Sequence, residues 1–301
     1  MTWLGVRDQV SDLVTLLVIG RLMASRTPPF PNPPLVLTVL EIRYPELSED
    51  LGERDWRQMG EAVRDRLPLA EARVEQQMNL FIGGSAPAPP SIQSRTFPRF
   101  STRDRTTALL VKSDALVIET TAYAGWAESF RPLVAEVVHA MERIRQPNGV
   151  LRIGLRYIDE IRVPGIESVP GDWRGYIDEH LLAAADPEFI PESLRPSEWL
   201  GHVQYQTAPD AMLTVRYGPQ SGYAVDPAGP TRRRNPHPPG LFFLLDSDSY
   251  WHDETEVPEF DAEWICERCD LLHQPVSEFF RIVVTDKLRD EVFDKRKGNQ
   301  R

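Results

Sequence analysis

The chain has 301 residues, of which 41% are hydrophobic and 26% charged, proportions typical of an ordinary globular protein. Its formal net charge of −11 disfavours nucleic-acid binding, because such binding needs a basic surface that neutralises phosphates. The chain carries 2 cysteines, which cannot form a disulfide framework, so we expect a reducing, cytoplasmic compartment.

The first segment, 1–32, is expected to be separate from the body. Its apolar run, Leu13 to Ile19, is too short to cross a bilayer of about 30 Å as a helix. Asp8 and Asp12 stand where a secretory signal carries positive charge. The apolar spacing predicts an amphipathic helix docked on the body or on a neighbouring subunit, and not a membrane anchor. The alternative is a poorly ordered tail added by an upstream start codon. A proline-rich linker, 26–34, follows.

A first module is expected over 33–165. It opens with the strand "LVLTVLEIRYP", which is apolar on both faces for half its length, so we expect it to be central in a sheet that is covered on both sides at that end. A tight hairpin is expected at Ser113–Asp114. The other predicted elements are a helix at 52–67, strands at 73–82, 91–100, 106–112 and 115–123, a helix at 127–145 and a strand at 150–163.

A smaller second module is expected over 166–301. Its predicted elements are a helix at 173–184, the strands "HVQYQTA" and "AMLTVRYG", a strand at 241–245 and a long closing helix at 260–294. Apolar residues spaced by four and three place one face of that closing helix in the core. Because the strands follow one another with few βαβ units, the chain predicts an α+β fold with a largely antiparallel sheet covered by helices.

Several separated stretches carry a family resemblance: "PLVLTVLEIRYPEL", "LVIETTAYAGWAESF", "RIGLRYIDEI", "FFLLDSDSYW" and "LLHQPVSEFFRIVVTDKLRD". Together they make the chain from residue 33 onward resemble a sporadically distributed, uncharacterised bacterial protein family. The resemblance implies no catalytic residue or cofactor. It implies a cytosolic protein from a patchily inherited locus, the pattern of mobile-element, toxin–antitoxin or phage-defence genes.

The acidic stretch 241–256 is the clearest candidate for chemistry. An apolar run leads to Asp246 and Asp248, and His252 and Asp253 follow. Carboxylate oxygens are the ligands that Mg²⁺ prefers, so one interpretation is a metal-dependent phosphoesterase or nuclease. Only helix is expected after this cluster, however, and an aspartyl nucleophile needs further strands to carry its partner groups.

The favoured interpretation of the same stretch is structural. Alternation along a strand places Asp246 and Asp248 together on one face. We expect that face to be solvated, and we expect Ser247 and Ser249 to help turn the chain at the strand end.

A second candidate is the set Cys266, Cys269 and His273, whose spacing places all three on one side of a helix. Thiolates and imidazole suit zinc, but no fourth ligand is evident beyond His252 or a distant carboxylate. The same positions follow the apolar stripe of the closing helix, so packing in the core is the favoured interpretation.

Positive charge is concentrated at Arg232, Arg233 and Arg234. Guanidinium groups there are candidates to bind a phosphate, a nucleic acid or an acidic protein surface, and the alternative is a solvated loop. A second, weaker basic run lies on strands and their turn, at Arg95, Arg99, Arg103 and Arg105. This second run either adds a contact surface or pairs with acidic residues of the sheet.

The strand "RIGLRYIDEI" places Arg152 and Arg156 on the face opposite its apolar residues. Acidic partners for them are available at Glu41 and Glu119, on other expected strands, and at Asp159. Cross-strand ion pairs are favoured over a buried active-site network.

No G-x-S-x-G, H-E-x-x-H, Walker A or dinucleotide motif is present. The leading hypothesis is therefore a cytoplasmic, non-enzymatic protein-interaction component without a cofactor. It would contact a protein partner or a second copy through Arg232–Arg234 and the N-terminal helix. The alternatives are the phosphoesterase described above and a small-ligand-binding protein with a cavity between sheet and closing helix.

Overall fold

The structure is a computed structural model that describes residues 30–48, 51–79, 91–166, 172–183, 190–194, 199–253 and 255–295. The amphipathic helix expected near the N-terminus lies outside these described residues.

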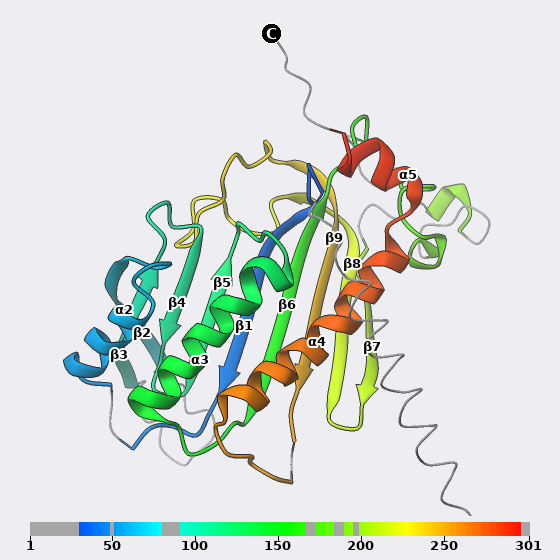
Figure 1. Cartoon of the computed structure of the whole chain (residues 1–301). Helices are drawn as coiled ribbons and strands as arrows, with labels where there is room; N and C mark the ends of the chain where they lie inside the picture. Colours follow the sequence, from blue (N-terminus) through cyan, green and yellow to red (C-terminus); the bar gives the residue numbers. More distant parts are fainter. Residues whose placement is uncertain are drawn as a thin grey trace, which may run out of the picture.

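All named strands belong to one antiparallel sheet, in the order β2-β3-β4-β5-β1-β6-β9-β8-β7 (Figure 1). The strands are β1 (Leu35–Arg43), β2 (Leu69–Asn79), β3 (Ser91–Ser101), β4 (Thr107–Val111), β5 (Ala115–Thr120), β6 (Arg152–Ile161), β7 (Gly201–Ala208), β8 (Ala211–Gly222) and β9 (Gly240–Trp251). The two predicted modules, 33–165 and 166–301, both contribute to this sheet, because β6 pairs with β9 from Ile153↔Trp251 to Ile161↔Phe243. The division between them stays a prediction.

The alternation of β1 explains how the sheet is built. Thr38, Leu40 and Ile42 are buried on one face, whereas Leu37 and Val39 on the other face are only partly covered. β1 lies between β5 and β6, which confirms its predicted central position, but the expected cover on both faces is incomplete, because Leu37 and Val39 are partly exposed.

The helices form a second layer on one face of the sheet (Figure 1). The principal ones are α2 (Glu53–Ala62), α3 (Arg131–Arg145) and α4 (Ala262–Val283). The apolar core lies between them and the sheet, with Leu40, Val137 and Leu272 among its buried members. This arrangement confirms the predicted α+β fold and its C-terminal helix. No helix in the described ranges is both long enough and apolar enough to span a membrane.

The remaining helical elements are short. η1 (Trp126–Phe130) precedes α3, and α5 (Asp286–Leu288) and η5 (Arg289–Phe293) follow α4. Two further turns, η2 (Glu179–Leu181) and η4 (Glu192–Leu194), lie between β6 and β7.

Two helix predictions need correction. The helix expected at 173–184 is wrong: Gly175 has a φ of +79°, and Ile177 makes an antiparallel bridge with Val284. The chain therefore turns at Gly175 instead of forming a helix, and Ile177 pairs with the end of α4. The helix expected at 260–294 is shorter than predicted, because Val284 leaves helical geometry and the Thr285 hydroxyl starts a new turn by accepting the Leu288 amide.

Adjacent leucines on α4 allow a matched test of the core. Leu272 is 2% exposed and Leu271 is 54% exposed. We expect Leu272→Ala to lower the free energy of unfolding by about 2–5 kcal/mol, because it leaves a cavity. Leu271→Ala should change it by no more than about 0.5 kcal/mol. Urea denaturation of both variants is the measurement, and equal losses would contradict this packing.

Candidate functional site

The face of the sheet opposite the helix layer, here called the open face, carries a row of cross-strand ion pairs. Asp246 lies opposite both Ile158 and Arg216 on the neighbouring strands. Arg156 binds both of its oxygens, donating from Nε at 2.6 Å and from Nη2 at 2.7 Å. Arg216 approaches the same carboxylate at 3.6 Å. Asp246 is therefore held by two arginines.

The row continues along β9 toward β1. Arg152 contacts Asp248 at 3.4 Å and Glu41 at 3.6 Å. Its guanidinium also lies over the ring of Tyr250, 4.7 Å from the centroid, a cation–π arrangement. The expectation that Arg152 and Arg156 form cross-strand ion pairs agrees with these distances.

Asp159 departs from that expectation. Its neighbour in the register is Leu245, which is buried against the helices, so Asp159 faces the helix layer and not the open face. Burial raises the pKa of Asp159 to about 8, and the charge of Asp246 adds to this effect. Glu119 does point to the open face, where Arg99 lies 3.7 Å from it.

The structure separates the members of the predicted acidic cluster. β9 continues to Trp251, so Ser247 and Ser249 are buried toward the helices, and the prediction that they turn the chain is wrong. The longer strand arises because its register with β6 and β8 is unbroken. His252 lies four residues beyond Asp248, about 13 Å along a strand.

Asp253 has a local role after the strand. Its carboxylate accepts hydrogen bonds from the Thr255 amide at 2.8 Å and the Thr255 hydroxyl at 2.7 Å, which closes a turn. Within the described part of the chain, no three His, Cys, Asp or Glu side chains are grouped as metal ligands would be.

The set Cys266, Cys269 and His273 lies on the inner side of α4. Both cysteines are buried as free thiols, and burial raises the pKa of Cys266 to about 11 and also raises that of Cys269. His273 stacks on Trp126 with ring centroids 4.7 Å apart, and its Nδ1 lies 3.0 Å from the hydroxyl of Tyr157. The two cysteines are thus buried in the core, and the half-buried His273 packs against Trp126 and Tyr157.

His273 gives a pH-dependent prediction. Burial, with the charge of Arg281, lowers its pKa from 6.5 to about 4, so it is neutral in the native state. Below pH 6.5 the unfolded chain takes up a proton on His273 before the folded chain does. The free energy of unfolding is therefore highest above pH 6.5 and falls as the pH is lowered toward 4. Between pH 7 and 5, the wild type should lose about 1–2 kcal/mol more than His273→Gln in urea unfolding. Parallel losses in both proteins would show that His273 does not titrate in this way.

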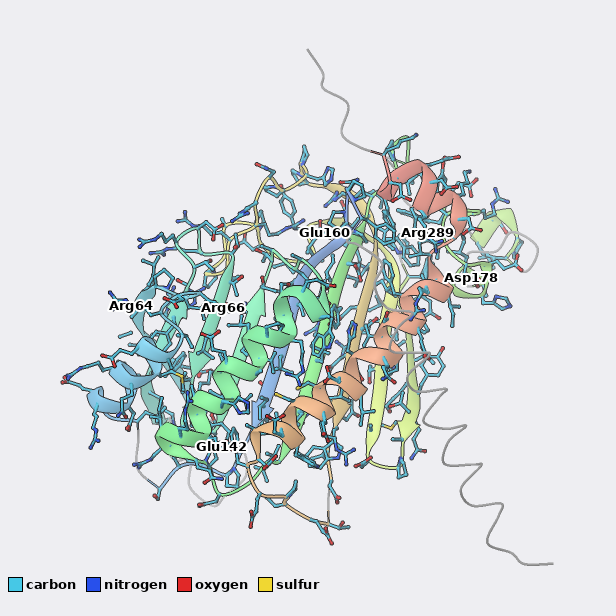
Figure 2. The ribbon with its side chains drawn as sticks, in the orientation of Figure 1. Arg64, Arg66, Glu142, Glu160, Asp178 and Arg289 are labelled. Carbon is cyan, nitrogen blue, oxygen red and sulfur yellow. The ribbon has the colours of Figure 1, made fainter. Side chains whose placement is uncertain are left out.

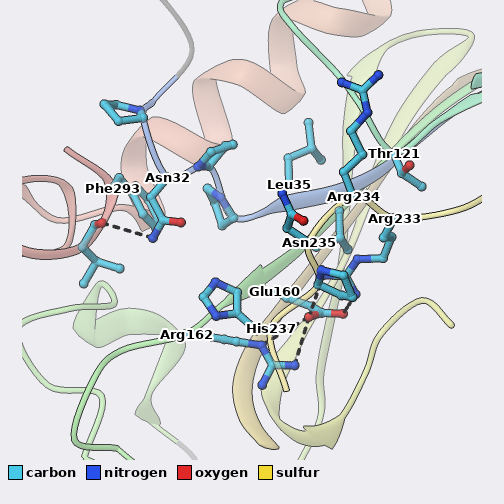
Figure 3. Close-up of a pocket in the computed structure, with 16 residues that line it drawn as sticks. Asn32, Leu35, Thr121, Glu160, Arg162, Arg233, Arg234, Asn235, His237 and Phe293 are labelled. Atoms are coloured by element: carbon cyan, nitrogen blue, oxygen red, sulfur yellow. Dashed lines mark hydrogen bonds and ion pairs between the residues drawn. The ribbon is translucent and has the colours of Figure 1, made fainter. Parts of the chain in front are cut away.

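Residues 223–239, here called the strap, join β8 to β9 and cross the upper end of the open face (Figure 1). Arg233 donates to Glu160 at 2.6 and 3.2 Å, and Arg162 donates to the same carboxylate at 3.0 Å (Figure 3). The Ala224 amide adds a bond of 2.9 Å. Burial alone would raise the pKa of Glu160, but Arg233, Arg162 and this amide hold it below its ordinary value. Glu160 therefore anchors one end of the strap near the top of β6 (Figure 2).

The middle of the strap is attached to β3, to β5 and to the turn between β3 and β4. The Arg232 amide donates to the Arg105 carbonyl at 2.8 Å. The Thr231 hydroxyl donates to Glu119 and accepts a bond of 2.9 Å from Nη2 of Arg99. The strap thus spans from β9 to β3, across the central strands.

These contacts define what each predicted arginine does. Arg233 is buried against Glu160, and Arg234 is paired with Asp104. Arg232 is exposed. Two of the three guanidinium groups therefore hold the strap in place, and the partner-binding role of the cluster stays a prediction.

A pocket of about 300 Å³ opens between the strap, the chain entering β1 and the end of η5 (Figure 3). Its polar floor is made by Glu160, Arg162 and Arg233. A second cavity of about 620 Å³ lies at the opposite end of the open face, beside Arg43, Trp56 and Lys112. No local pattern marks Glu160 or Arg162 as pocket residues, because the strap residues that bind Glu160, Ala224 and Arg233, lie 64 and 73 positions away in the sequence.

Comparisons with known proteins identify no family: no family model matches the chain, and no curated protein matches it significantly.

The ion-pair row gives a graded prediction. Asp246 is buried and bound through both oxygens, whereas Asp248 is 34% exposed and contacts one arginine at 3.4 Å. Asp246→Ala should lower the free energy of unfolding by about 1.5–3 kcal/mol, because it leaves Arg156 without its acceptor. Asp248→Ala should cost less than about 1 kcal/mol. Chemical denaturation compares the two, and an equal or reversed order would contradict the geometry.

Proposed function

We propose that the chain is a non-enzymatic, cytoplasmic protein-interaction component that binds a protein partner through the open face. The observation that carries the proposal is the one-sided covering of the sheet: the described helices pack on one face only. Broad sheet faces with an apolar centre and charged edges resemble protein–protein interfaces.

The centre of the open face is apolar. Leu37 and Val39 on β1, Val117 on β5 and Leu110 on β4 all point to it and are partly exposed. A partner that covers these four side chains would remove apolar surface from water, at roughly 25 cal/mol per Å².

The edges of the open face are charged. Arg43 and Arg216 are more than half exposed, while their partners Glu41 and Asp246 are more buried. Exposed cations beside shielded anions favour a partner with acidic side chains around its contact area. Arg232 on the strap adds one further exposed cation.

The family resemblance supports a biological setting for such a partner. The resemblance implies a patchily inherited locus of the toxin–antitoxin, immunity or phage-defence kind. We propose that the partner is encoded in such a locus.

Of the alternatives, a small-ligand-binding protein has an observation in its favour: two cavities have volumes of about 300 and 620 Å³, although neither is lined by α4, where the cavity was expected. Ligand pockets commonly lie in this range. The phosphoesterase is less well supported, because the carboxylate of Asp246 is occupied by Arg156.

Charge reversal on each side of the molecule tests the proposed interface. The open-face variant combines Arg43→Glu and Arg216→Glu. The matched control combines Arg64→Glu and Arg143→Glu, both exposed and both in the helix layer; Arg64 follows α2 (Figure 2). Affinity purification from the native cells, with mass spectrometry, measures the recovered proteins.

We expect the wild type and the control to recover the same partner, and the open-face variant to recover at least tenfold less, because the reversed charges repel its acidic residues. Unfolding curves must first show that both variants fold. Recovery of no protein above a tag-only control, or equal recovery by all three, would contradict the proposal.

A further inference from the structure

Unpaired hydrogen-bond donors are enclosed beneath the strap. The side chain of Arg99 is 1% exposed. Its Nη2 donates to the Pro230 carbonyl and to Thr231, both at 2.9 Å, but its Nε and Nη1 have no acceptor in the described structure. The Nε of Arg73 is also buried without an acceptor. Buried polar groups normally have partners, so these donors need an explanation.

The register brings further charges to the same place. Glu71 is the cross-strand partner of Arg99, and Arg73 lies two residues along β2, on the same face. Arg105, in the turn after β3, contacts Glu71 at 2.8 Å. Glu119 completes the group from β5, 3.7 Å from Arg99. These five residues, Glu71, Arg73, Arg99, Arg105 and Glu119, are here called the Arg99 cluster.

The Arg99 cluster has more positive than negative charge: three guanidinium groups against two carboxylates. Burial lowers the pKa of Arg99, and the charges of Arg73 and Arg105 act in the same direction. Glu119 and Glu71 act against them without cancelling the effect. A buried cation is stable only when an anion compensates it. The group therefore carries a net positive charge around the one buried guanidinium, that of Arg99.

We propose that the Arg99 cluster binds a small tetrahedral oxyanion, a phosphate ion or the phosphoryl group of a small ligand. Planar guanidinium groups present parallel N–H donors that fit the oxygens of phosphate. The unpaired Nε and Nη1 of Arg99 and Nε of Arg73 supply donors for it. A trapped water would accept these hydrogens but would leave the charge uncompensated.

The strap closes the site on one side, and the partly exposed Arg73 and Arg105 leave it open to solvent on the other. Thr231 and Pro230 fix one nitrogen of Arg99 from above. Arg73 and Arg105 are 38% and 40% exposed, so they reach solvent while Arg99 does not. An anion would enter between these two side chains. Glu71, which both of them bind, would yield one of its partners to the incoming ligand.

Titration with inorganic phosphate tests the site. The measurement is isothermal calorimetry together with thermal unfolding, in sodium phosphate and in sodium chloride at matched ionic strength. Arg99→Gln is the direct variant, but it changes a fully buried residue. Arg73→Gln and Arg105→Gln therefore serve as partly exposed alternatives. Arg95→Gln is the matched control, because Arg95 lies on the same face of β3 but pairs with Glu46 at 2.8 Å.

We expect saturable phosphate binding by the wild type and by Arg95→Gln, and at least tenfold weaker binding by Arg73→Gln and Arg105→Gln. Adenosine diphosphate and adenosine are the probes that distinguish a free phosphate ion from the phosphoryl group of a larger ligand. Tighter binding of the diphosphate than of phosphate, with none of adenosine, would assign the phosphoryl group of a larger ligand. Equal binding of diphosphate and phosphate would assign the free ion.

A rise in stability that does not saturate and is common to both sodium salts would overturn the proposal. Equal phosphate binding by the wild type, Arg95→Gln, Arg73→Gln and Arg105→Gln would also overturn it. An enclosed water would then be the occupant, and the proposed protein-binding role of the open face would be unaffected.

Discussion

Alternation of side chains across an antiparallel sheet, combined with helices on one face only, governs the rest of this structure. Every strand residue has two possible environments, an apolar core under α2, α3 and α4 or the open face. Residues of opposite chemistry therefore stand side by side in sequence, as Tyr157 and Arg156 do on β6. A shift of one residue in the register would move the core-facing residues to the open face and the open-face residues into the core. The burial of the apolar residues therefore fixes the register.

The open face is consequently stabilised by a different kind of interaction from the core. Its charged side chains pair across strands, as Arg156 does with Asp246 and Arg152 with Asp248, and also along single strands, as Arg43 does with Glu41. Such pairs contribute little each when exposed, but they keep a broad uncovered face from being uniformly apolar. Leu37 and Val39 remain as an apolar centre between charged edges.

The sequence predicted those features that depend on neighbours in the chain. The alternation of β1 and the β4–β5 hairpin, with its turn at Ser113–Asp114, follow from local patterns. The expected helix at 173–184 failed because Gly175 and the bridge from Ile177 to Val284 outweigh helical spacing. A contact with a residue more than 100 positions away leaves no trace in the local pattern.

In the candidate sites, too, local pairings were predictable from the sequence and contacts between distant positions were not. The pairing of Arg152 and Arg156 with acidic residues was predictable from strand periodicity. The burial of Arg233 by Glu160 was not, because the two lie 73 residues apart. Arg99 lay in a basic run that the sequence identified, but its enclosure depends on Thr231, 132 residues away. Nothing local indicates that a loop from the end of β8 will cover β3.

This covering loop also has a consequence for the order of assembly. Contacts between positions so distant in sequence form only after a large loss of chain entropy, so they close late in folding. β3 and β4 come early in the chain, and the segment that covers them is made only after β8. The enclosure around Arg99 is therefore a property of the finished molecule, and a partly synthesised chain would present that arginine to solvent.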